Sequence, residues 1–208
     1  MCRFGGIPLQ KKKAGAGMYE ERLKWTTLGR KLLLHTPVYD VYSQRERSAT
    51  GIEGDYVAID APDWVMTIPL YQGKFVMVRQ WRHSAEALSL EFPGGVADPG
   101  EDPAVTARRE LEEETGFRVG KLTHLGTVNP NPALFKNRFH CYLAEDLRPT
   151  GDLHLDPDEL LNCELVDVDR VLAGYGGPEY CHALMGTALA FYLLHLQRRN
   201  GKSGEGEG

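Results

Sequence analysis

Three glutamates within one short segment have a spacing that could support metal chemistry. Residues 95–117 read GVADPGEDPAVTARRELEEETGF and include Glu110, Glu113 and Glu114. On a helix, positions i, i+3 and i+4 share one face, and like charges there cost about a few tenths of a kcal/mol per pair. Arg109 lies four residues before Glu113 and offsets only part of this repulsion. Because hard divalent cations such as Mg²⁺ prefer carboxylate oxygens, phosphates and water, the pattern favours a divalent-metal site over a solvated acidic helix.

The flanking residues predict the helix that must carry these glutamates. Asp102 is a suitable N-cap, Pro103 fits the first helical position, and Gly116 fits the position after the last turn. Three residues define an apolar face beside the acidic one: Ala104, Ala107 and Leu111. Glu114 lies at the border of the two faces, so we expect it to be partly shielded from water. The turn at residues 93–95, Pro-Gly-Gly, lets the backbone approach a ligand closely.

These residues resemble the Nudix box, G-x5-E-x7-R-E-U-x-E-E-x-G-U, in which U is a bulky aliphatic or aromatic residue. The sequence matches it at every defined position: Gly95, Glu101, Arg109, Glu110, Leu111, Glu113, Glu114, Gly116 and Phe117. The preceding stretch FVMVRQWRHSAEALSLEFPGG resembles the ADP-ribose pyrophosphatase branch of the family, as does Pro132, about fifteen residues after the box. The resemblance covers roughly residues 35–170.

This resemblance implies hydrolysis of a nucleoside diphosphate linked to another group, by attack of water on one phosphorus. It implies Mg²⁺ as the cofactor, with Mn²⁺ as a possible substitute. Glu110 and Glu114 are then the leading metal ligands, Glu113 is a further ligand, and the backbone carbonyl of Gly94 supplies another oxygen.

The remaining box residues are expected to support these ligands. By resemblance, Arg109 orients a glutamate, either Glu101 or Glu113, and a structural pairing with Glu101 is favoured. Gly95, Glu101 and Gly116 are interpreted as structural residues of the box.

The general base is expected in an acidic loop beyond the box, at residues 151–160 (GDLHLDPDEL). Glu159 is the first candidate, followed by Asp158 and Asp156. A merely solvated loop is the alternative interpretation, and Glu113 could instead act as the base.

Substrate-binding candidates lie on either side of the box. Arg82 is positioned at the end of a predicted strand, where a guanidinium could bind a phosphate or the terminal sugar, or could be a surface charge. Pro132 is expected to shape a loop beside the site, and His83 to be a loop residue. Trp64 and Trp81 could stack on a base, although such residues more often fill a core.

Three functions are compatible with the pattern. The first is hydrolysis of ADP-ribose to AMP and ribose 5-phosphate, and the second is the same reaction on a GDP- or UDP-hexose. The sugar is uncertain because Asn131 precedes Pro132 and no glutamate closely follows it. The third is a nucleotide-binding sensor without catalysis, which the intact box disfavours.

The chain of 208 residues divides by composition into four segments. Residues 1–20 are expected to form a disordered arm, with Met18 as a possible true start, and residues 201–208 a disordered tail. Residues 21–60 form a β-rich segment, which by resemblance would help to build a homodimer. Residues 61–200 form the Nudix hydrolase domain.

Within these segments the pattern predicts strands, a helix, further strands and a closing helix. A hairpin is predicted at residues 64–70 and 74–81, and the closing helix at residues 178–200. Other β structure is expected at residues 31–47, 55–62, 119–128 and 138–147. This order indicates the α/β class: an α/β/α sandwich around a mixed sheet, with an additional N-terminal antiparallel β-rich segment.

The bulk composition is that of an ordinary globular protein, with 42% hydrophobic and 25% charged residues. The formal net charge of −5 argues against nucleic-acid and anionic-membrane partners, and the resemblance implies a small nucleoside diphosphate derivative instead. Neither a membrane-length apolar run nor a secretory signal is present. The four scattered cysteines favour a reduced, cytoplasmic protein, and zinc binding through the Cys–His neighbours at 140–141 and 181–182 is disfavoured.

Overall fold

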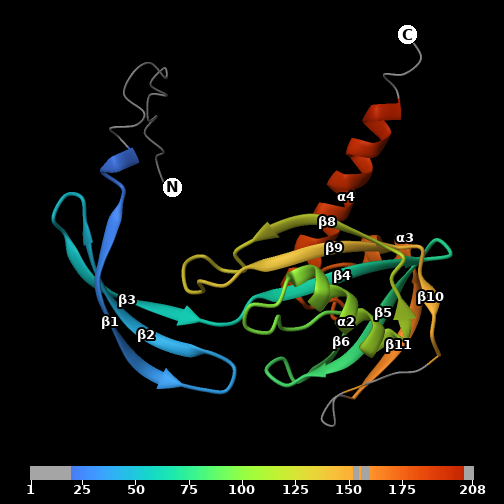
Figure 1. Ribbon diagram of the computed structural model, residues 1–208, viewed down its shortest axis with the longest axis horizontal. Helices are drawn as coiled ribbons and strands as arrows, with labels where there is room; N and C mark the ends of the chain where they lie inside the picture. The colour runs from blue at the N-terminus through green and yellow to red at the C-terminus, as the bar shows by residue number, and fades with distance from the viewer. Residues whose placement is uncertain (1–19, 152–154, 156–159, 204–208) are drawn as a thin grey trace, which may run out of the picture. The chain divides into compact units, whose positions relative to one another are not determined.

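The computed structural model describes residues 20–151, 155 and 160–203. The chain divides into two compact units, with the division between Asp60 and Ala61 (Figure 1). None of the helices in the described part has the length and hydropathy of a membrane-spanning segment.

The first unit contains an antiparallel sheet of three strands in the order β1-β2-β3. The strands are β1 (Trp25–His35), β2 (Asp40–Ser48) and β3 (Glu53–Asp60). The β structure predicted at residues 31–47 is therefore two strands rather than one stretch. The Thr36 side chain organises the turn between them, accepting hydrogen bonds from the amides of Val38 and Tyr39 at 3.2 and 2.9 Å. Pro37, inside this turn, has no amide hydrogen to give to a strand ladder.

The second unit is built around a six-stranded sheet with the strand path β11-β5-β4-β9-β8, in which β6 also pairs with β5. The strands of this sheet are β4 (Trp64–Tyr71), β5 (Lys74–Arg82), β6 (Ala87–Glu91), β8 (Lys121–Val128), β9 (Phe139–Glu145) and β11 (Leu161–Asp167). Pairing is parallel between β4 and β9 and antiparallel elsewhere, so the sheet is mixed. A separate ribbon joins β7 (Phe117–Arg118) to β10 (Arg148–Pro149).

The predicted hairpin is present as β4 and β5. Its turn residues Gln72 and Gly73 both have positive φ, at 50° and 77°. Only Leu70–Phe75 and Tyr71–Lys74 pair between the strands, because β4 continues alongside β9 and β5 alongside β11 and β6.

Helices cover both faces of this sheet (Figure 1). On one face, α2 (Pro103–Thr115) packs Leu111 against Val76. On the other, α3 (Val168–Gly174) and α4 (Ala183–Ser203) contribute to a larger core that includes Phe75 and Met185. This arrangement is the predicted α/β/α sandwich.

The closing helix has different bounds from those predicted. It begins at Ala183 rather than residue 178, because the preceding backbone is used elsewhere: the carbonyl of Glu179 accepts the amide of Leu90 at 2.9 Å, and Tyr180 is buried in the core. The helix then continues to Ser203, three residues into the segment predicted to be a tail.

Candidate active site

The ends of α2 are fixed by the residues that the sequence indicated. The side chain of Asp102 accepts a hydrogen bond from the amide of Ala104 at 2.9 Å, and Pro103 follows as the first helical residue. Gly116 ends the helix in the left-handed region, with φ 66°, and its amide donates to the carbonyl of Glu112. These ends fix the register of α2, so the acidic face has one orientation relative to the sheet.

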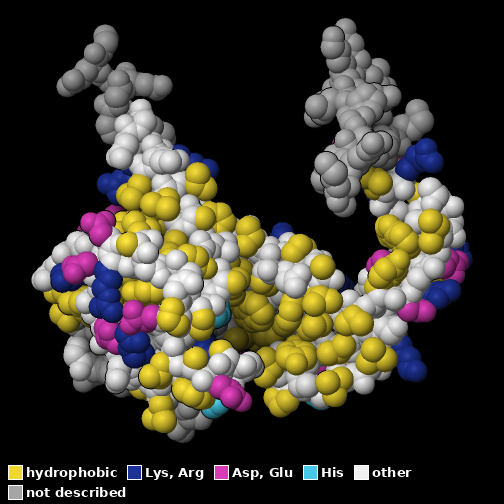
Figure 2. Space-filling model, turned by 180° about the vertical axis from the view of Figure 1, so that it is seen from behind, with side chains coloured by type: hydrophobic (Ala, Val, Ile, Leu, Met, Phe, Trp, Pro, Cys, Tyr) yellow, Lys and Arg dark blue, Asp and Glu magenta, His cyan; other side chains and the backbone are white. Residues whose placement is uncertain are grey.

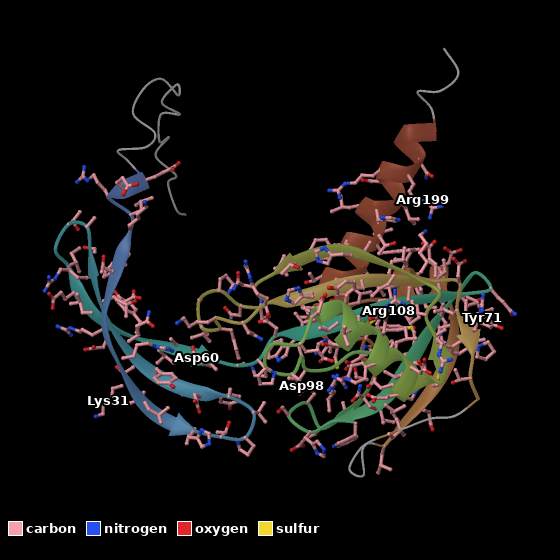
Figure 3. The ribbon with its side chains drawn as sticks, viewed as in Figure 1. Lys31, Asp60, Tyr71, Asp98, Arg108 and Arg199 are labelled. Atoms are coloured by element: carbon pink, nitrogen blue, oxygen red, sulfur yellow. The ribbon has the colours of Figure 1, made fainter. Side chains whose placement is uncertain are left out.

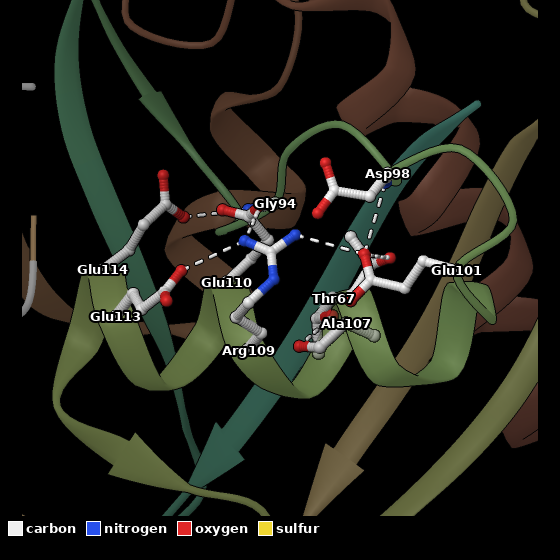
Figure 4. A network of polar contacts seen from close by, with 10 residues as sticks. Thr67, Gly94, Asp98, Glu101, Ala107, Arg109, Glu110, Glu113 and Glu114 are labelled. Carbon is white, nitrogen blue, oxygen red and sulfur yellow. Dashed lines mark hydrogen bonds and ion pairs between the residues drawn. The ribbon is translucent and has the colours of Figure 1, made fainter. Parts of the chain in front are cut away.

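Arg109 lies at the centre of the acidic face (Figure 4). Its guanidinium contacts three carboxylates: Glu110 at 2.8 Å, Glu113 at 3.2 Å and Glu101 at 3.3 Å. Partial burial disfavours the charged form, but the carboxylates of Glu101 and Glu110 outweigh it and raise the pKa of Arg109 above its ordinary value. We call these four residues, Glu101, Arg109, Glu110 and Glu113, the Arg109 cluster. One guanidinium is shared by three carboxylates.

Glu101 connects this cluster to the loop before the helix. Its carboxylate accepts hydrogen bonds from the Thr106 hydroxyl at 2.8 Å and the Asp98 amide at 3.3 Å. The hydrogen bonds from Thr106 and Arg109 lower the pKa of Glu101. These contacts connect Glu101 to both the loop and the helix. Arg108, the neighbouring basic residue of α2 (Figure 3), instead donates to the carbonyl of Val119 at 3.1 Å.

Glu114 is buried beside the glycine turn, with 3% of its surface exposed. Its carboxylate accepts a hydrogen bond from the amide of Gly94 at 2.9 Å. A side chain at Gly94 would meet the carbonyl oxygen of Val65 at 2.2 Å, and one at Gly95 would meet the Glu110 carboxylate at 2.5 Å. Gly94 therefore allows the turn to lie against β4, and Gly95 allows it to lie against the acidic helix face.

The structure thus brings together the residues predicted to hold a metal. Glu110 and Glu114 both adjoin the glycine turn, and Glu113 joins Glu110 through Arg109. The donor set consists of oxygens, which suits Mg²⁺ or Mn²⁺ rather than a soft metal. Within the described residues, no three His, Cys, Asp or Glu side chains already converge as a metal site. Here Gly94 meets Glu114 through its amide, whereas the sequence argument invoked its carbonyl.

A cavity of about 270 Å³ opens beside the glycine turn. Its lining includes Gly94, Gly95 and the predicted substrate residue Arg82. Most other lining residues are apolar: Trp64, Val65, Met66, Phe92, Val96, Phe139 and Leu184. The acidic helix face and an aromatic-lined cavity therefore meet at the same turn.

Arg82 is held in this cavity by a carboxylate that the sequence argument missed. Its Nε donates to Glu91 at 2.9 Å and its Nη2 to the second oxygen of the same group at 2.5 Å. Glu91 is fully buried. Burial alone would raise its pKa, yet the hydrogen bonds and charge of Arg82, with His182, lower it. The charge of Glu114 also contributes to the raised pKa of Arg82, so this guanidinium lies within electrostatic range of the box.

A second residue that sequence reasoning missed is His182, which directly precedes α4 and lines the same cavity. Glu91 could have been noticed as an acid between two apolar residues in LSLEFPGG. The sequence singled out His182 only as a neighbour of Cys181 in a disfavoured zinc site, and nothing in it pointed to this cavity.

The other predicted residues lie at varying distances from the cavity. Trp64 lines it and packs against Phe135, with ring centroids 5.5 Å apart, whereas Trp81 is 48% exposed and is not part of the lining. Pro132 is exposed in the loop that carries Phe135, and His83 is exposed as well. The three base candidates Glu159, Asp158 and Asp156 fall outside the described residues.

The chain belongs to the NUDIX domain family, whose pattern it matches over residues 62–182. It is 30% identical over 177 residues to the ADP-ribose pyrophosphatase of Bacillus subtilis (strain 168). This match covers 84% of this chain and 95% of that protein. It is 34% identical over 95 residues to the ADP compounds hydrolase NudE of Escherichia coli (strain K12), covering 46% of this chain and 50% of that protein.

A solved crystal structure of an ADP compounds hydrolase has a similar fold. The TM-score is 0.74 at 26% sequence identity, and the match covers 89% of this chain and 97% of that one. The family, the fold class and the assignment to Nudix hydrolases that the sequence predicted are confirmed.

Proposed function

We propose that the protein hydrolyses the diphosphate linkage of ADP-ribose or a closely related nucleoside diphosphate sugar in a Mg²⁺-dependent reaction. With ADP-ribose the products are AMP and ribose 5-phosphate. The single observation that carries the proposal is the buried Glu114 carboxylate against the Gly94 turn, beside the aromatic-lined cavity that contains Arg82. The similarity to proteins named for ADP-ribose and ADP compounds supports this choice of substrate.

The proposed metal ligands are Glu110 and Glu114, with Glu113 and the Gly94 carbonyl completing the set. A bound divalent cation neutralises phosphate oxygens and lowers the pKa of water. The chain's own contribution is to hold these oxygens on a rigid helix and to keep one side of the site apolar. Mn²⁺, which also accepts oxygen ligands, is expected to substitute.

Arg109 and Arg82 have different proposed roles. Arg109 is a positioning residue, because its contacts are with Glu101, Glu110 and Glu113. Arg82 is the proposed diphosphate ligand. Buried Glu91 fixes its Nε and Nη2, and within the described residues its Nη1 makes no hydrogen bond. A guanidinium fixed in this way presents its remaining donors in one orientation.

For the general base we propose the same carboxylate candidates that the sequence indicated. Glu159 is the first candidate, with Asp158 and Asp156 behind it and Glu113 as the alternative within α2. Glu113 is half-buried and its carboxylate contacts Arg109 at 3.2 Å, so this group is already engaged within the Arg109 cluster. This consideration favours the loop candidates.

We also propose that the protein is a cytoplasmic homodimer. The β1-β2-β3 sheet leaves large apolar side chains exposed, among them Leu32, Leu34 and Val57 at about half exposure (Figure 2). The strand register places Leu32 on one face of this sheet and Leu34 and Val57 on the other, and exposed apolar surface on a sheet favours association with another protein surface. The described cysteines are all free thiols, which supports a reducing compartment.

The test is product analysis of the purified protein with ADP-ribose, GDP-mannose and UDP-glucose, each with Mg²⁺ and with EDTA. Mg²⁺-dependent release of AMP from ADP-ribose supports the proposal, whereas preference for a hexose substrate supports the alternative pyrophosphatase. Tight nucleotide binding without turnover of any substrate would contradict the proposed hydrolase activity and favour a nucleotide-binding sensor.

A further inference from the structure

The cavity beside the glycine turn draws residues from distant parts of the second unit. Arg82 comes from the end of β5 and Phe139 from the start of β9. Leu184 comes from the first turn of α4, and His182 from the segment just before it. The size of about 270 Å³ corresponds to about nine water molecules in the liquid. This volume lies near the lower end of the range for small-molecule sites, and it has room for a sugar ring.

Among the described residues, the charged or titratable side chains that line this cavity are Arg82 and His182. Arg82 is already engaged by Glu91. The Nδ1 atom of His182 is buried and has no hydrogen-bond partner among the described residues. A buried polar atom without a partner costs free energy, and such atoms in native proteins usually find a partner in water or a ligand.

The protonation state of His182 indicates which chemical groups can form a hydrogen bond with its ring. Burial lowers its pKa, Glu91 works in the opposite direction, and Arg82 lowers it further, so the net shift is downward. The ring is therefore neutral at pH 7, with one nitrogen as donor and the other as acceptor. A hydroxyl can donate or accept, so it pairs with either ring nitrogen, whereas a phosphate would be better served by a cation.

We propose that His182 is a specificity-determining residue that hydrogen-bonds a hydroxyl of the sugar beyond the diphosphate, with that sugar ring seated in the cavity against Trp64 and Phe139. This inference rests on the proposed function, because Arg82 and the box carboxylates must hold the adjoining diphosphate. The apolar wall packs against the faces of the ring, and His182 then supplies a directional contact that an apolar cavity lacks.

The experiment measures binding of two small probes by isothermal titration calorimetry: ribose 5-phosphate, which carries the sugar, and inorganic phosphate, which does not. The variants are His182→Leu, which removes the polar atoms, and His182→Asn, which keeps a polar group near the Nδ1 position. His124→Gln is the matched control, since His124 is an exposed histidine of β8 outside the cavity lining.

Loss of one hydrogen bond should weaken ribose 5-phosphate binding about tenfold in His182→Leu. Inorganic phosphate should bind all three variants like wild type, and His182→Asn should recover part of the sugar phosphate affinity. In kinetics with ADP-ribose, His182→Leu should raise KM more than it lowers kcat. Circular dichroism and the thermal midpoint verify folding. If His182→Leu does not fold, the same binding comparison is made with His182→Asn.

Three results would overturn the inference: equal weakening of both probes, unchanged sugar phosphate binding in His182→Leu, or no binding of ribose 5-phosphate by the wild type at millimolar concentration. These outcomes differ from failure of the proposed function. If the wild type turns over no diphosphate sugar, the function fails whatever the probes do. If it does turn one over and His182→Leu binds the sugar phosphate normally, only the role of His182 fails.

Discussion

Two arginine–carboxylate clusters on the second unit have similar chemistry and different charge balance. In the Arg109 cluster, one guanidinium contacts the three carboxylates of Glu101, Glu110 and Glu113. In the second, which we call the Arg79 cluster, Arg79 contacts Glu164 at 2.5 Å and Glu179 at 2.6 Å, and Arg170 contacts Glu179 at 3.2 Å (residues Arg79, Glu164, Arg170 and Glu179). The second cluster pairs two cations with two anions.

The comparison shows which cluster has an unbalanced charge. Hydrogen bonds from Arg79 to Glu164 and Glu179 raise the pKa of Arg79, and the charges around it already balance. The Arg109 cluster leaves a surplus of negative charge next to the buried Glu114. A divalent metal would neutralise that surplus, whereas the Arg79 cluster serves as a brace between β5, β11 and the segment before α4.

The largest expected effect comes from Glu114→Gln. The substitution keeps the shape of the side chain but removes the charge proposed to bind the metal. We expect kcat with ADP-ribose to fall by at least about a hundredfold at saturating Mg²⁺, because metal stabilisation of the transition state is worth several kcal/mol. Steady-state kinetics over a Mg²⁺ titration measure this loss.

Glu112→Gln is the matched control for this experiment. Glu112 lies on the same helix but contacts Arg118 at 2.7 Å, outside the Arg109 cluster. Its substitution should leave kcat within about twofold of wild type, as expected for an exposed ion pair. Equal losses in both variants would remove the distinction between the acidic face and the rest of α2.

Arg109→Met should have the next largest effect, and the effect should depend on metal. Removal of the guanidinium leaves its three carboxylates to repel one another, so the thermal midpoint should fall in EDTA. Mg²⁺ should restore most of the midpoint by binding the folded state. We expect kcat to fall by about tenfold because the glutamates lose their orientation. A midpoint that Mg²⁺ does not restore would argue against metal binding at this cluster.

The sequence predicted one of these clusters and not the other, for a physical reason. The residues of the Arg109 cluster all lie between residues 101 and 113, so helical geometry places Glu110 and Glu113 on one face without knowledge of the fold. Glu164 and Glu179 are 85 and 100 residues from Arg79. The pairing of β5 with β11 brings Glu164 close, and the backbone hydrogen bond between Leu90 and Glu179 holds the segment before α4 nearby.

The polar residues of the cavity likewise come from distant parts of the sequence and are brought together only by the fold. Arg82 and Glu91 meet because β5 pairs with β6, and His182 joins them from a segment 100 residues beyond Arg82. Hydrophobic patterning predicted the layers of the sandwich correctly, since α2 and α4 each show an apolar face. The same patterning placed the start of α4 too early. Periodicity contains no information about the backbone hydrogen bond from Leu90 to Glu179.

Arg79→Met is expected to reduce stability with little effect on catalysis. Removing this guanidinium leaves two half-buried carboxylates with fewer partners, and we expect a loss of about 1–3 kcal/mol in the free energy of unfolding. The kcat of the folded variant should stay within about twofold of wild type, and Mg²⁺ should not restore the lost stability. Urea denaturation with and without Mg²⁺ measures both points. Restoration by Mg²⁺ would show that the two clusters do not differ in the way proposed.

The smallest expected effect is the pH dependence that Glu179 adds to stability. Hydrogen bonding from Arg79 lowers the pKa of Glu179 in the folded protein. A lowered carboxyl pKa stabilises the fold above the unfolded-chain value of about 4.3, and this contribution disappears as the pH falls through the lower folded value. The stability difference between wild type and Glu179→Gln should therefore be constant near neutrality and shrink in acid. Urea denaturation at a series of pH values between neutrality and the acid limit of folding measures it. A difference that stays constant down to the most acidic pH would mean that the Glu179 carboxylate gains nothing from Arg79, and the Arg79 cluster would then hold the fold by packing alone.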